Sequence, residues 1–497
     1  MVELPFNIKL SLKTFDLMQA QERQGIMFDI ETAIKLVTYI DSEMLKIKES
    51  VEPVLPKRPL NKTEEKAWTP PKKLFKKDGS FSTLCEKWFD ECVVYNDGGI
   101  TLAQGIKNGI KVQLPCEKPI INELPMELKH QSDLKAWLVS IGWEPTLWNY
   151  QVKNGQKVRD ERGQLVKTSP KLHQNGQLCP NLERLGDKIQ IVKPITTWLS
   201  LRNRRSVLLN EDKGTGWLNH PRLKIDGRLP ASSSGLTNTH REKHRVVANI
   251  PRSTSLLGAE FRSLFQAPKG KVLVGYDASS LEARVKGHYT YPFDNGEYAD
   301  KLLDPDWDEH TENASVWLGK PMQDVQKDER QDIKPGTFAL QYNCQPPTLA
   351  RTLGVPLKQA EVWWNAYWEQ NWALRSAIEE TEREFEKNSK KFITTIDGSK
   401  IVTRAKHSVF NAKCQSAGQK IMNLSLVFMD KWLKQRGVPA QRVVVYHDEG
   451  LFQTSPEYAE LVGELGVKSI VKAGEYFKMN VPLDGEYSVG QSWLECH

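Results

Sequence analysis

The stretch KVLVGYDASSLEAR, residues 271–284, contains the pattern that decides the fold. A short apolar run from Val272 to Tyr276 ends at Asp277, and the chain then passes into a helical pattern. A short apolar run that ends at a turn is typical of a buried strand. We therefore expect a strand that holds the Asp277 carboxylate at the edge of a buried sheet.

A second acidic strand end lies far along the chain, in VVVYHDEGLFQ, residues 443–453. This stretch predicts two apolar strands that turn around Asp448 and Glu449. Two divalent ions about 3.5–4 Å apart can hold the attacking and leaving oxygens of a phosphoryl transfer, and they need carboxylates at neighbouring strand ends. Either aspartate alone can simply cap a turn, but Asp277 and Asp448 together favour such a site.

Between these strands, RQDIKPGTFALQY, residues 330–342, spaces four side chains by four residues: Arg330, Lys334, Phe338 and Tyr342. This spacing turns a helix by about 400°, so the four side chains follow one face. Two cations followed by two aromatic rings suit a nucleoside triphosphate, because phosphates need neutralising charge and the base and sugar need a flat wall. The alternative is that the aromatic rings pack into a core.

Composition narrows the class of protein. The 497 residues suggest about three domains, and 39% apolar with 26% charged residues exclude a disordered, collagen-like or disulfide-stapled chain. The net charge of +7 is modest. No apolar run approaches the ~20 residues of a membrane span and no secretory signal is present, so we expect a cytoplasmic protein without membrane partners. Seven cysteines without a C-x-x-C pair predict reduced, structural thiols.

Periodicity predicts the remaining organisation. Residues 8–50 indicate two amphipathic helices that break near Gly25. The stretch 51–77 is rich in Pro and Lys, which predicts an exposed loop or insertion. Helical patterns follow at 191–209 and through most of 308–390.

Three motifs in this order resemble motifs A, B and C of family A DNA polymerases: DASSLEAR (277–284), RQDIKPGTFALQY (330–342) and YHDEG (446–450). Further stretches such as QERQGIMFD (21–29), DEHTEN (308–313) and NAKCQSAG (411–418) extend the resemblance over essentially the whole chain. It is closest to the replicative polymerases of T-odd phages. The resemblance implies an α+β right-hand polymerase fold with an antiparallel β palm, helical fingers and a helical thumb.

The resemblance also implies domain boundaries and an activity. The thumb would cover 1–212 with the basic insertion near 51–77, the palm 213–285 and 406–497, and the fingers 286–405. The chain would be a template-directed DNA polymerase of phage-type replication that adds dNTPs to a primer 3′ end by a two-metal-ion mechanism. Its partners would be primer-template DNA and dNTPs. Its cofactor would be a pair of Mg²⁺ ions, with Mn²⁺ as a substitute.

Residue roles follow from the same resemblance. The catalytic residues would be Asp277, Asp448 and Glu449, and the metal ligands would be Asp277, the carbonyl of Ala278, and Asp448. The nucleotide would bind Arg330, Lys334 and His310 through its triphosphate, Phe338 through sugar and base, and Glu282, which blocks a ribose 2′-hydroxyl. Tyr342 would lie against the templating base. The DNA would contact Arg241, Asn411 and Gln415 in the minor groove and His447 beside the primer end.

Some features depart from this pattern. Asp29 and Glu31 mimic the D-x-E of a proofreading exonuclease, but their surroundings resemble thumb sequence and continue as helix. We therefore expect this chain to lack its own exonuclease, and a separate exonuclease subunit is a hypothesis, as is a processivity factor at the thumb insertion. Pro335 predicts a kink or late start in its helix. Asn343 stands where relatives commonly carry glycine.

Two alternatives compete with this interpretation. A single-subunit RNA polymerase would use the same metal chemistry, but Glu282 argues against ribonucleotide substrates. A non-catalytic DNA-binding or scaffold protein of polymerase ancestry would not need Asp277, Asp448, Arg330 and Lys334 intact.

Overall fold

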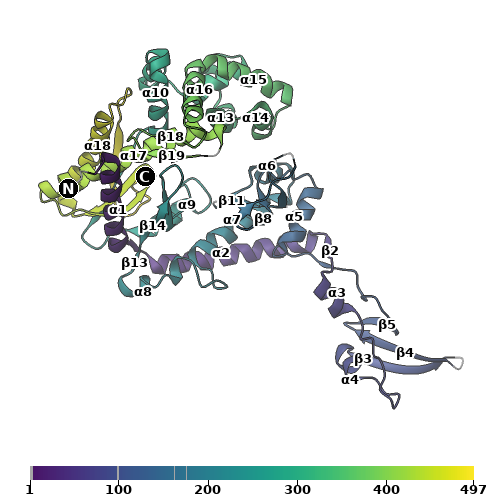
Figure 1. Cartoon of the computed structure of the whole chain (residues 1–497). Coiled ribbons are helices and arrows are strands. Elements are labelled where there is room, and N and C mark those ends of the chain that lie inside the picture. Colours follow the sequence, from purple (N-terminus) through teal and green to yellow (C-terminus); the bar gives the residue numbers. More distant parts are fainter. Residues whose placement is uncertain (1–3, 98–99, 162, 175, 404, 497) are drawn as a thin grey trace. The chain divides into compact units, whose positions relative to one another are not determined.

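The computed structural model describes residues 4–97, 100–161, 163–174, 176–403 and 405–496. The chain forms two compact units, a larger one of residues 1–36 and 207–497 and a smaller one of residues 37–206. It passes between them within α2 (Ile30–Val51) and α7 (Val192–Leu208) (Figure 1). The proposed division into thumb, palm and fingers stays a prediction.

The larger unit is built on a four-stranded antiparallel sheet in the order β20-β21-β17-β22. Its strands are β20 (Gln441–Tyr446), β21 (Glu449–Thr454), β17 (Val272–Ala278) and β22 (Gly485–Gly490). The two apolar runs that predicted acidic strand ends are therefore β17 and the β20-β21 hairpin, as expected.

Two helices, α17 (Val409–Gln435) and α18 (Ala459–Tyr476), share the main core with this sheet. Gly466 of α18 lies directly on the ring of Tyr276, because a Cβ at position 466 would stand 2.6 Å from the Tyr276 Cγ. This close approach fixes β17, and with it the strand end that carries Asp277, against α18.

A block of helices follows β17, and Figure 1 shows α10 and α13 to α16 gathered together in the larger unit. Its helices are α10 (Leu281–Asp294), α11 (Glu297–Leu303), α12 (Glu309–Leu318), α13 (Lys327–Gln341), α14 (Pro346–Leu353), α15 (Leu357–Gln370) and α16 (Trp372–Lys387). The predicted helical content of 308–390 is confirmed.

Helix α13 begins at Lys327, well before Pro335, and continues through it. Gln326 and Glu329 form a reciprocal capping box that satisfies the first backbone N–H groups and so starts the helix early. A start after Pro335, one of the two outcomes expected, is therefore wrong, and a kink stays a prediction. Asn343 just beyond this helix has φ 58°, the left-handed conformation that glycine adopts most readily.

The N-terminal helices are confirmed as α1 (Phe6–Gln24) and α2, with strand β1 (Ile26–Phe28) between them. Asp29 accepts a hydrogen bond from the backbone N–H of Thr32 at 2.9 Å, at the beginning of α2. Glu31 pairs with Lys35 one turn later at 2.6 Å. Both acids therefore have local roles in a helix.

Short elements complete the larger unit. They are α8 (Leu223–Asp226), β13 (Arg228–Leu229), β14 (Ala231–Leu236), β15 (Glu242–Val246), α9 (Gly258–Ser263), β16 (Phe265–Gln266), β18 (Phe392–Thr394) and β19 (Lys400–Val402). Of these, the hairpin of β14 and β15 is connected by the loop that contains Arg241.

The smaller unit has a core of its own around Trp143, Leu128 and Ile195. This core packs α7, α5 (Gln131–Ser140) and α6 (Pro180–Lys188). Six short strands pair two by two, β7 with β10, β8 with β9 and β11 with β12. They are β7 (Trp148–Tyr150), β8 (Val152–Lys153), β9 (Gln156–Lys157), β10 (Lys167–Pro170), β11 (His173–Gln174) and β12 (Gln177–Leu178).

Of the two outcomes expected for the Lys-rich stretch 51–77, an exposed loop or an insertion, a plain loop is wrong. The stretch forms β2 (Lys57–Pro59), which pairs with β6 (Glu123–Pro125), and α3 (Lys62–Trp68), which Asn61 and Glu64 close with a capping box. Helix α4 (Thr83–Trp88) and strands β3 (Glu91–Asp97), β4 (Ile100–Lys107) and β5 (Ile110–Leu114) follow. These elements are too short for their periodicity to stand out.

The sequence predicted that the chain has no membrane-spanning segment and that its cysteines are reduced. In the described ranges, no helix combines the length and apolar character that spanning a membrane requires. All seven cysteines are free thiols, as expected.

Candidate active site

Asp277 stands in a row of carboxylates at one end of the central sheet. In the antiparallel register it lies opposite Glu449 on β21 and opposite Glu486 on β22. Residues directly opposite each other project from the same face with Cβ atoms about 4.5–5.5 Å apart. Asp448 occupies the turn before β21, and its carbonyl accepts a hydrogen bond from the Ala278 N–H at 3.3 Å. The sheet therefore brings together the two predicted acidic strand ends.

The electrostatics of this edge reflect crowded negative charge. Burial raises the pKa of Asp277 to about 8, and the charges of Asp448, Glu449 and Glu486 contribute in the same direction. Burial also raises the pKa of Glu449 to about 7, although the Trp493 indole N–H donates a hydrogen bond to its carboxylate. A cation at this edge would relieve the repulsion.

The donor set suits a hard divalent cation. Mg²⁺ prefers oxygen ligands and commonly uses only one or two protein carboxylates, completed by water and substrate phosphate. The carboxylates of Asp277 and Asp448 and the carbonyl of Ala278 provide such oxygens. Across the residues with described positions, no cluster of three or more His, Cys, Asp or Glu is arranged to hold a metal. A metal here therefore depends on two aspartates, the backbone and a bound substrate.

A cavity of about 260 Å³ lies beside this edge, between α10, α12, α13 and α17. Its volume is slightly below the range of about 300–1,000 Å³ that is typical of small-molecule sites. Five of the predicted site residues line it: Glu282, His310, Phe338, Tyr342 and Asn411. Only Ser279, Ser280 and Leu281 separate Glu282 from the strand end at Asp277 and Ala278.

Glu282 is held in place from two helices. The Tyr342 hydroxyl donates a hydrogen bond to its Oε1 at 2.9 Å, and the Gln415 amide donates to the same oxygen at 3.2 Å. Burial, followed by the negative charge of Glu282, raises the pKa of Tyr342, which therefore stays a donor. Three predicted residues from α10, α17 and the end of α13 thus meet at one carboxylate.

The aromatic wall of the cavity pairs Phe338 with His310. Their ring centroids lie 5.1 Å apart in an edge-to-face arrangement, and the Lys334 ammonium lies 5.9 Å from the centroid of the Phe338 ring. Burial lowers the pKa of His310. Its Nδ1 and the Asn411 Oδ1 are buried without a hydrogen-bond partner among the described residues. Buried polar atoms in this state normally bind water or a ligand.

Arg330 does not line the cavity. Its guanidinium forms a two-point ion pair with Asp308, with Nε to Oδ2 at 2.7 Å and Nη2 to Oδ1 at 2.6 Å. Asp308 is also the N-cap of α12, because its Oδ2 accepts the backbone N–H of Thr311 at 2.8 Å. Burial opposes ionisation of Asp308, but Arg330 and Thr311 hold its pKa below the usual value. Arg330 is thereby tied to the helix that presents His310.

Two further residues of the predicted site are His447 and Arg241. His447 has φ 61° in the turn before Asp448, and its ring packs against Tyr446 and His244 at 4.3 and 5.5 Å. Burial lowers the pKa of His447, and the nearby charge of Arg241 acts in the same direction. The Arg241 charge also acts on Tyr342. The charge of Arg241 therefore acts on a residue beside the acidic edge and on a residue that lines the cavity.

The sequence did not reveal several charged or polar residues of the site. Lys286, Glu309 and Gln341 line the cavity, Asp308 holds Arg330, and Glu486 faces Asp277. Only Asp308 had a recognisable signal, an aspartate placed as the N-cap of a helical run. Partners that meet through tertiary packing, such as Lys286 and Glu309, leave no local pattern.

Comparisons with known proteins agree with this geometry. The family model described as DNA polymerase family A matches residues 181–495. DNA polymerase I of Pseudomonas aeruginosa is 28% identical over 293 residues, which are 56% of this chain and 30% of that protein. The DNA-directed DNA polymerase of Escherichia phage T7 is 24% identical over 413 residues, which are 77% of this chain and 54% of that protein.

Among solved structures, the POL domain of Pol1 from M. smegmatis, in a complex with DNA primer-template and dNTP, has a TM-score of 0.66 at 16% identity. The likeness covers 98% of this chain and 70% of that one. It confirms the predicted fold class, the α+β right-hand polymerase fold. Bacterial and phage enzymes both match, so the expected closest likeness to T-odd phages stays a prediction.

Proposed function

The chain belongs to DNA polymerase family A, and from this we propose that it is a template-directed DNA polymerase that extends a primer 3′ end with deoxynucleotides. It spans about half the length, or less, of the curated relatives described above. The observation that carries the proposal is the juxtaposition of the Asp277-Asp448 edge with the cavity lined by Glu282, His310 and Phe338. A polymerase needs these two features together, because the nucleotide must lie within reach of the metal-binding carboxylates.

Asp277, Asp448 and the Ala278 carbonyl would hold the divalent ions, generally Mg²⁺ in this family. When bound, two such ions activate the primer 3′-hydroxyl and stabilise charge on the leaving pyrophosphate. Glu449 is buried and accepts a hydrogen bond from the Trp493 indole N–H. Its proposed role is therefore to support the acidic edge of the sheet. Mn²⁺ has similar ligand preferences and would substitute.

Glu282 would select the sugar. Hydrogen bonds from Tyr342 and Gln415 fix its carboxylate at the cavity wall, so a ribose 2′-hydroxyl would meet an immobile group there. Phe338 would pack on the sugar and base, and Tyr342 would lie against the templating base. His310, Lys334 and Arg330 would bind the triphosphate, which requires Arg330 to share or exchange its present partner Asp308.

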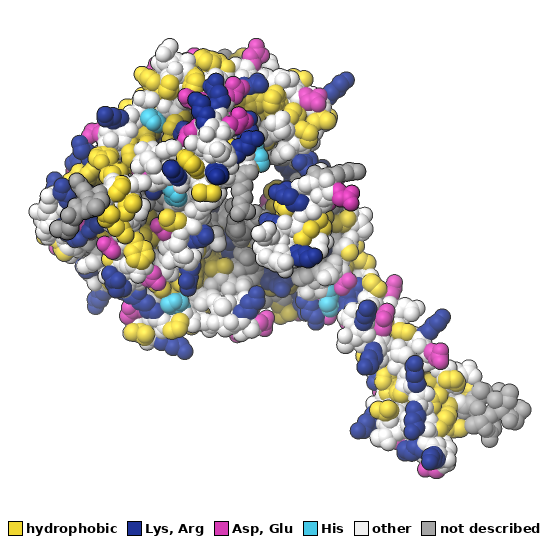
Figure 2. Space-filling model, in the orientation of Figure 1, with side chains coloured by type: hydrophobic (Ala, Val, Ile, Leu, Met, Phe, Trp, Pro, Cys, Tyr) yellow, Lys and Arg dark blue, Asp and Glu magenta, His cyan; other side chains and the backbone are white. Residues whose placement is uncertain are grey.

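The DNA contacts proposed are non-specific. Arg241, Asn411, Gln415 and His447 surround the two parts of the site, and donors of this kind can bind the acceptors that all base pairs present in the minor groove. On the face shown in Figure 2, basic and acidic side chains are interspersed over the larger unit. Binding is therefore expected to depend on groups near the site, with a moderate salt dependence.

We also propose a partner for the segment that contains α3, α4 and strands β3 to β5. Val93 and Val94 on β3 are 55% and 42% exposed, and Figure 2 shows hydrophobic side chains among basic ones in this part of the chain. A processivity factor that binds this segment would cover them. A pull-down in which Val93→Lys removes the captured partner would support the proposal, and unchanged capture would contradict it.

The wider context is part of the same proposal. The likeness to the phage T7 enzyme is consistent with phage-type replication in the cytoplasm of a host. Asp29 and Glu31 serve local roles in α2, which supports the proposal that this chain does not itself degrade primers. A separate exonuclease subunit would then supply proofreading.

One experiment tests the proposed activity. The purified chain with Mg²⁺, a labelled primer-template and dNTPs should lengthen the primer by template-directed steps. Ribonucleotides in place of dNTPs should be used poorly, whereas a single-subunit RNA polymerase would prefer them. A chain that binds the duplex without extending it would be a scaffold of polymerase ancestry, and this result would contradict the proposal.

A further inference from the structure

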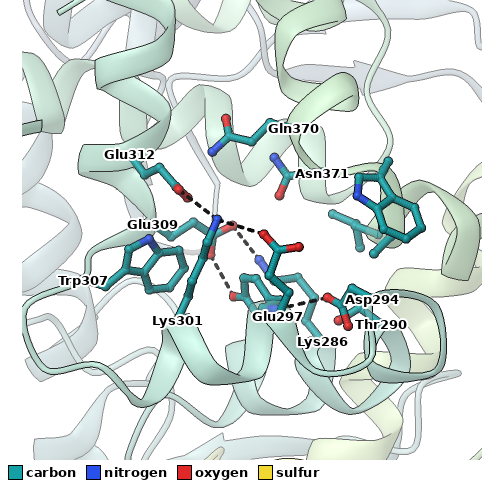
Figure 3. A pocket seen from close by; sticks show the side chains of 14 residues that line it. Lys286, Thr290, Asp294, Glu297, Lys301, Trp307, Glu309, Glu312, Gln370 and Asn371 are labelled. Atoms are coloured by element: carbon teal, nitrogen blue, oxygen red, sulfur yellow. Dashed lines mark hydrogen bonds and ion pairs between the residues drawn. The ribbon is translucent and has the colours of Figure 1, made fainter. Parts of the chain in front are cut away.

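A buried carboxylate that the proposed chemistry does not use lies in the wall of the nucleotide cavity. Glu309 of α12 has three partners: the Lys286 ammonium at 2.5 Å, the Gln341 amide at 3.0 Å and the Tyr298 hydroxyl at 3.1 Å. The Lys286 and Glu309 side chains are only 7% and 14% exposed. Figure 3 shows them meeting at the wall of a second cavity, which they also line.

These contacts join α11 to three of the helices that frame the nucleotide cavity, α10, α12 and α13. Lys286 belongs to α10, which carries Glu282 in its first turn, and Glu309 precedes His310 on α12. Tyr298 belongs to α11, and Gln341 is the last residue of α13, directly before Tyr342. The C-terminal end of α13 is therefore held twice, by Gln341 on Glu309 and by Tyr342 on Glu282.

We infer that Glu309 is a positioning residue for nucleotide selection: it holds Gln341, and through Gln341 it fixes the end of α13, so that Tyr342 keeps Glu282 in place against the incoming sugar. This inference rests on the proposed function, because it assumes that a nucleotide occupies the cavity. It assigns Lys286 the supporting role of keeping Glu309 ionised and oriented.

The energetics explain why the pair is suited to this task. Burial alone would raise the pKa of Glu309, but the Lys286 charge and the hydrogen bonds from Lys286 and Gln341 hold it below the ordinary value. An ionised acceptor binds an amide donor more strongly than a neutral one. Removing only one member of the pair would leave the other as a buried, uncompensated charge. A single substitution would therefore destabilise the fold, and this effect could not be separated from the loss of positioning.

The test therefore compares two double variants that both lack the charges. Lys286→Met with Glu309→Gln keeps an oxygen that accepts from Gln341, whereas Lys286→Met with Glu309→Met does not. We expect the first to keep the KM for dNTP within about threefold of wild type and the second to raise it about tenfold, the effect of losing one hydrogen bond to a charged or amide acceptor. The kcat should change by less than about threefold in both.

A third variant removes the contact from the other side. Gln341→Met leaves the Lys286-Glu309 pair intact and should also raise the KM for dNTP about tenfold. Both it and the methionine double variant should discriminate less between dNTP and rNTP, because Tyr342 and Glu282 lose their fixed position. A purely structural role would lower the melting temperature without changing this discrimination.

The matched control is the neighbouring ion pair that Figure 3 also shows, Lys301 with Glu312 at 3.1 Å. It joins α11 and α12 beside the same second cavity, and the ion pairs of these two side chains within the described part of the chain do not include a residue of α13. Lys301→Met with Glu312→Gln should keep the wild-type KM and sugar discrimination. Binding of dNTP to the complex with a dideoxy-terminated primer, measured without turnover, should change in parallel with KM.

The outcomes separate the two proposals. Wild-type primer extension with unchanged KM and discrimination in both Gln341→Met and the methionine double variant would overturn the role of Glu309 alone. An equal KM rise in the glutamine double variant would also overturn it, since the acceptor would then not matter. A wild-type chain that does not extend primers would overturn both this inference and the proposed function.

Discussion

The Tyr342 hydroxyl donates a hydrogen bond to the Glu282 carboxylate at 2.9 Å, which joins the C-terminal end of α13 to the first turn of α10. Gln415 donates to the same oxygen from α17. Two donors to one oxygen restrict the rotation of this exposed carboxylate. The sequence places a suitable carboxylate at position 282, and the two hydrogen bonds define where this carboxylate lies in the cavity wall.

Glu282→Ala should increase ribonucleotide use, because it removes the group that a 2′-hydroxyl would meet. We expect the ratio of kcat/KM for dNTP over rNTP to fall about 10- to 100-fold, the range of steric discrimination by one pocket group. Steady-state extension on one template measures the ratio. Glu297→Ala, on the neighbouring helix α11, is the control and should keep the ratio within about twofold. An unchanged ratio in Glu282→Ala would contradict the selection role.

His244 predicts a pH dependence of stability. Burial lowers its pKa from 6.5 to about 4, so between these values the unfolded chain binds a proton that the folded chain does not. Neutral His244 therefore makes its full contribution to the free energy of unfolding above pH 6.5. This contribution is lost as the pH falls toward 4. His244→Phe keeps a ring against Tyr446 but cannot titrate, so its melting temperature should fall less than that of wild type between pH 7 and pH 5. Equal falls would show that His244 does not titrate in this way.

Asp308 has two separable contributions, the N-cap of α12 and the ion pair with Arg330. Asp308→Ala should reduce the free energy of unfolding by about 1–2 kcal/mol through the lost cap. Asp308→Ser restores a cap but not the ion pair, and it should recover most of this loss, since partly exposed ion pairs contribute little. Urea unfolding measures both. A serine variant as unstable as the alanine variant would show that the ion pair dominates.

A labelled single-stranded primer should stay intact when incubated with the chain and Mg²⁺ without dNTPs. The reason is that Asp29 and Glu31, the D-x-E of the sequence, are engaged as a helix-start acceptor and a surface ion pair. Gel electrophoresis over a time course measures this. Shortening that disappears in Asp29→Asn with Glu31→Gln would show that these acids do form an exonuclease site.

The elements around the site were predictable wherever a local pattern encodes them. The strand before Asp277 and the hairpin around Asp448 followed from short apolar runs, and the helices α12 to α16 followed from the periodicity of 308–390. The start of α13 was not predictable from Pro335 alone, because the capping box of Gln326 and Glu329 starts the helix first. The low helix propensity of proline favoured a helix start after Pro335, but the capping box sets the start at Lys327.

The contacts between distant residues that form the site could not be predicted from local sequence patterns. The register that places Glu486 opposite Asp277 and the ion pair of Lys286 with Glu309 depend on how distant segments pack. A charged residue in a helical stretch predicts exposure, so buried pairs of this kind are misjudged by default. The family resemblance identified candidate residues, but only the structure showed Arg330 bound to Asp308.

The central claim is that Asp277 and Asp448 form one metal-dependent catalytic edge, and primer extension by Asp277→Asn and Asp448→Asn tests it most directly. Each substitution keeps the shape but removes a charge, so extension with Mg²⁺ should fall about 1,000-fold or more while the affinity for primer-template DNA stays near that of wild type. Glu486→Gln, across the sheet from Asp277, should retain most activity. Near-wild-type extension by either asparagine variant would contradict the account.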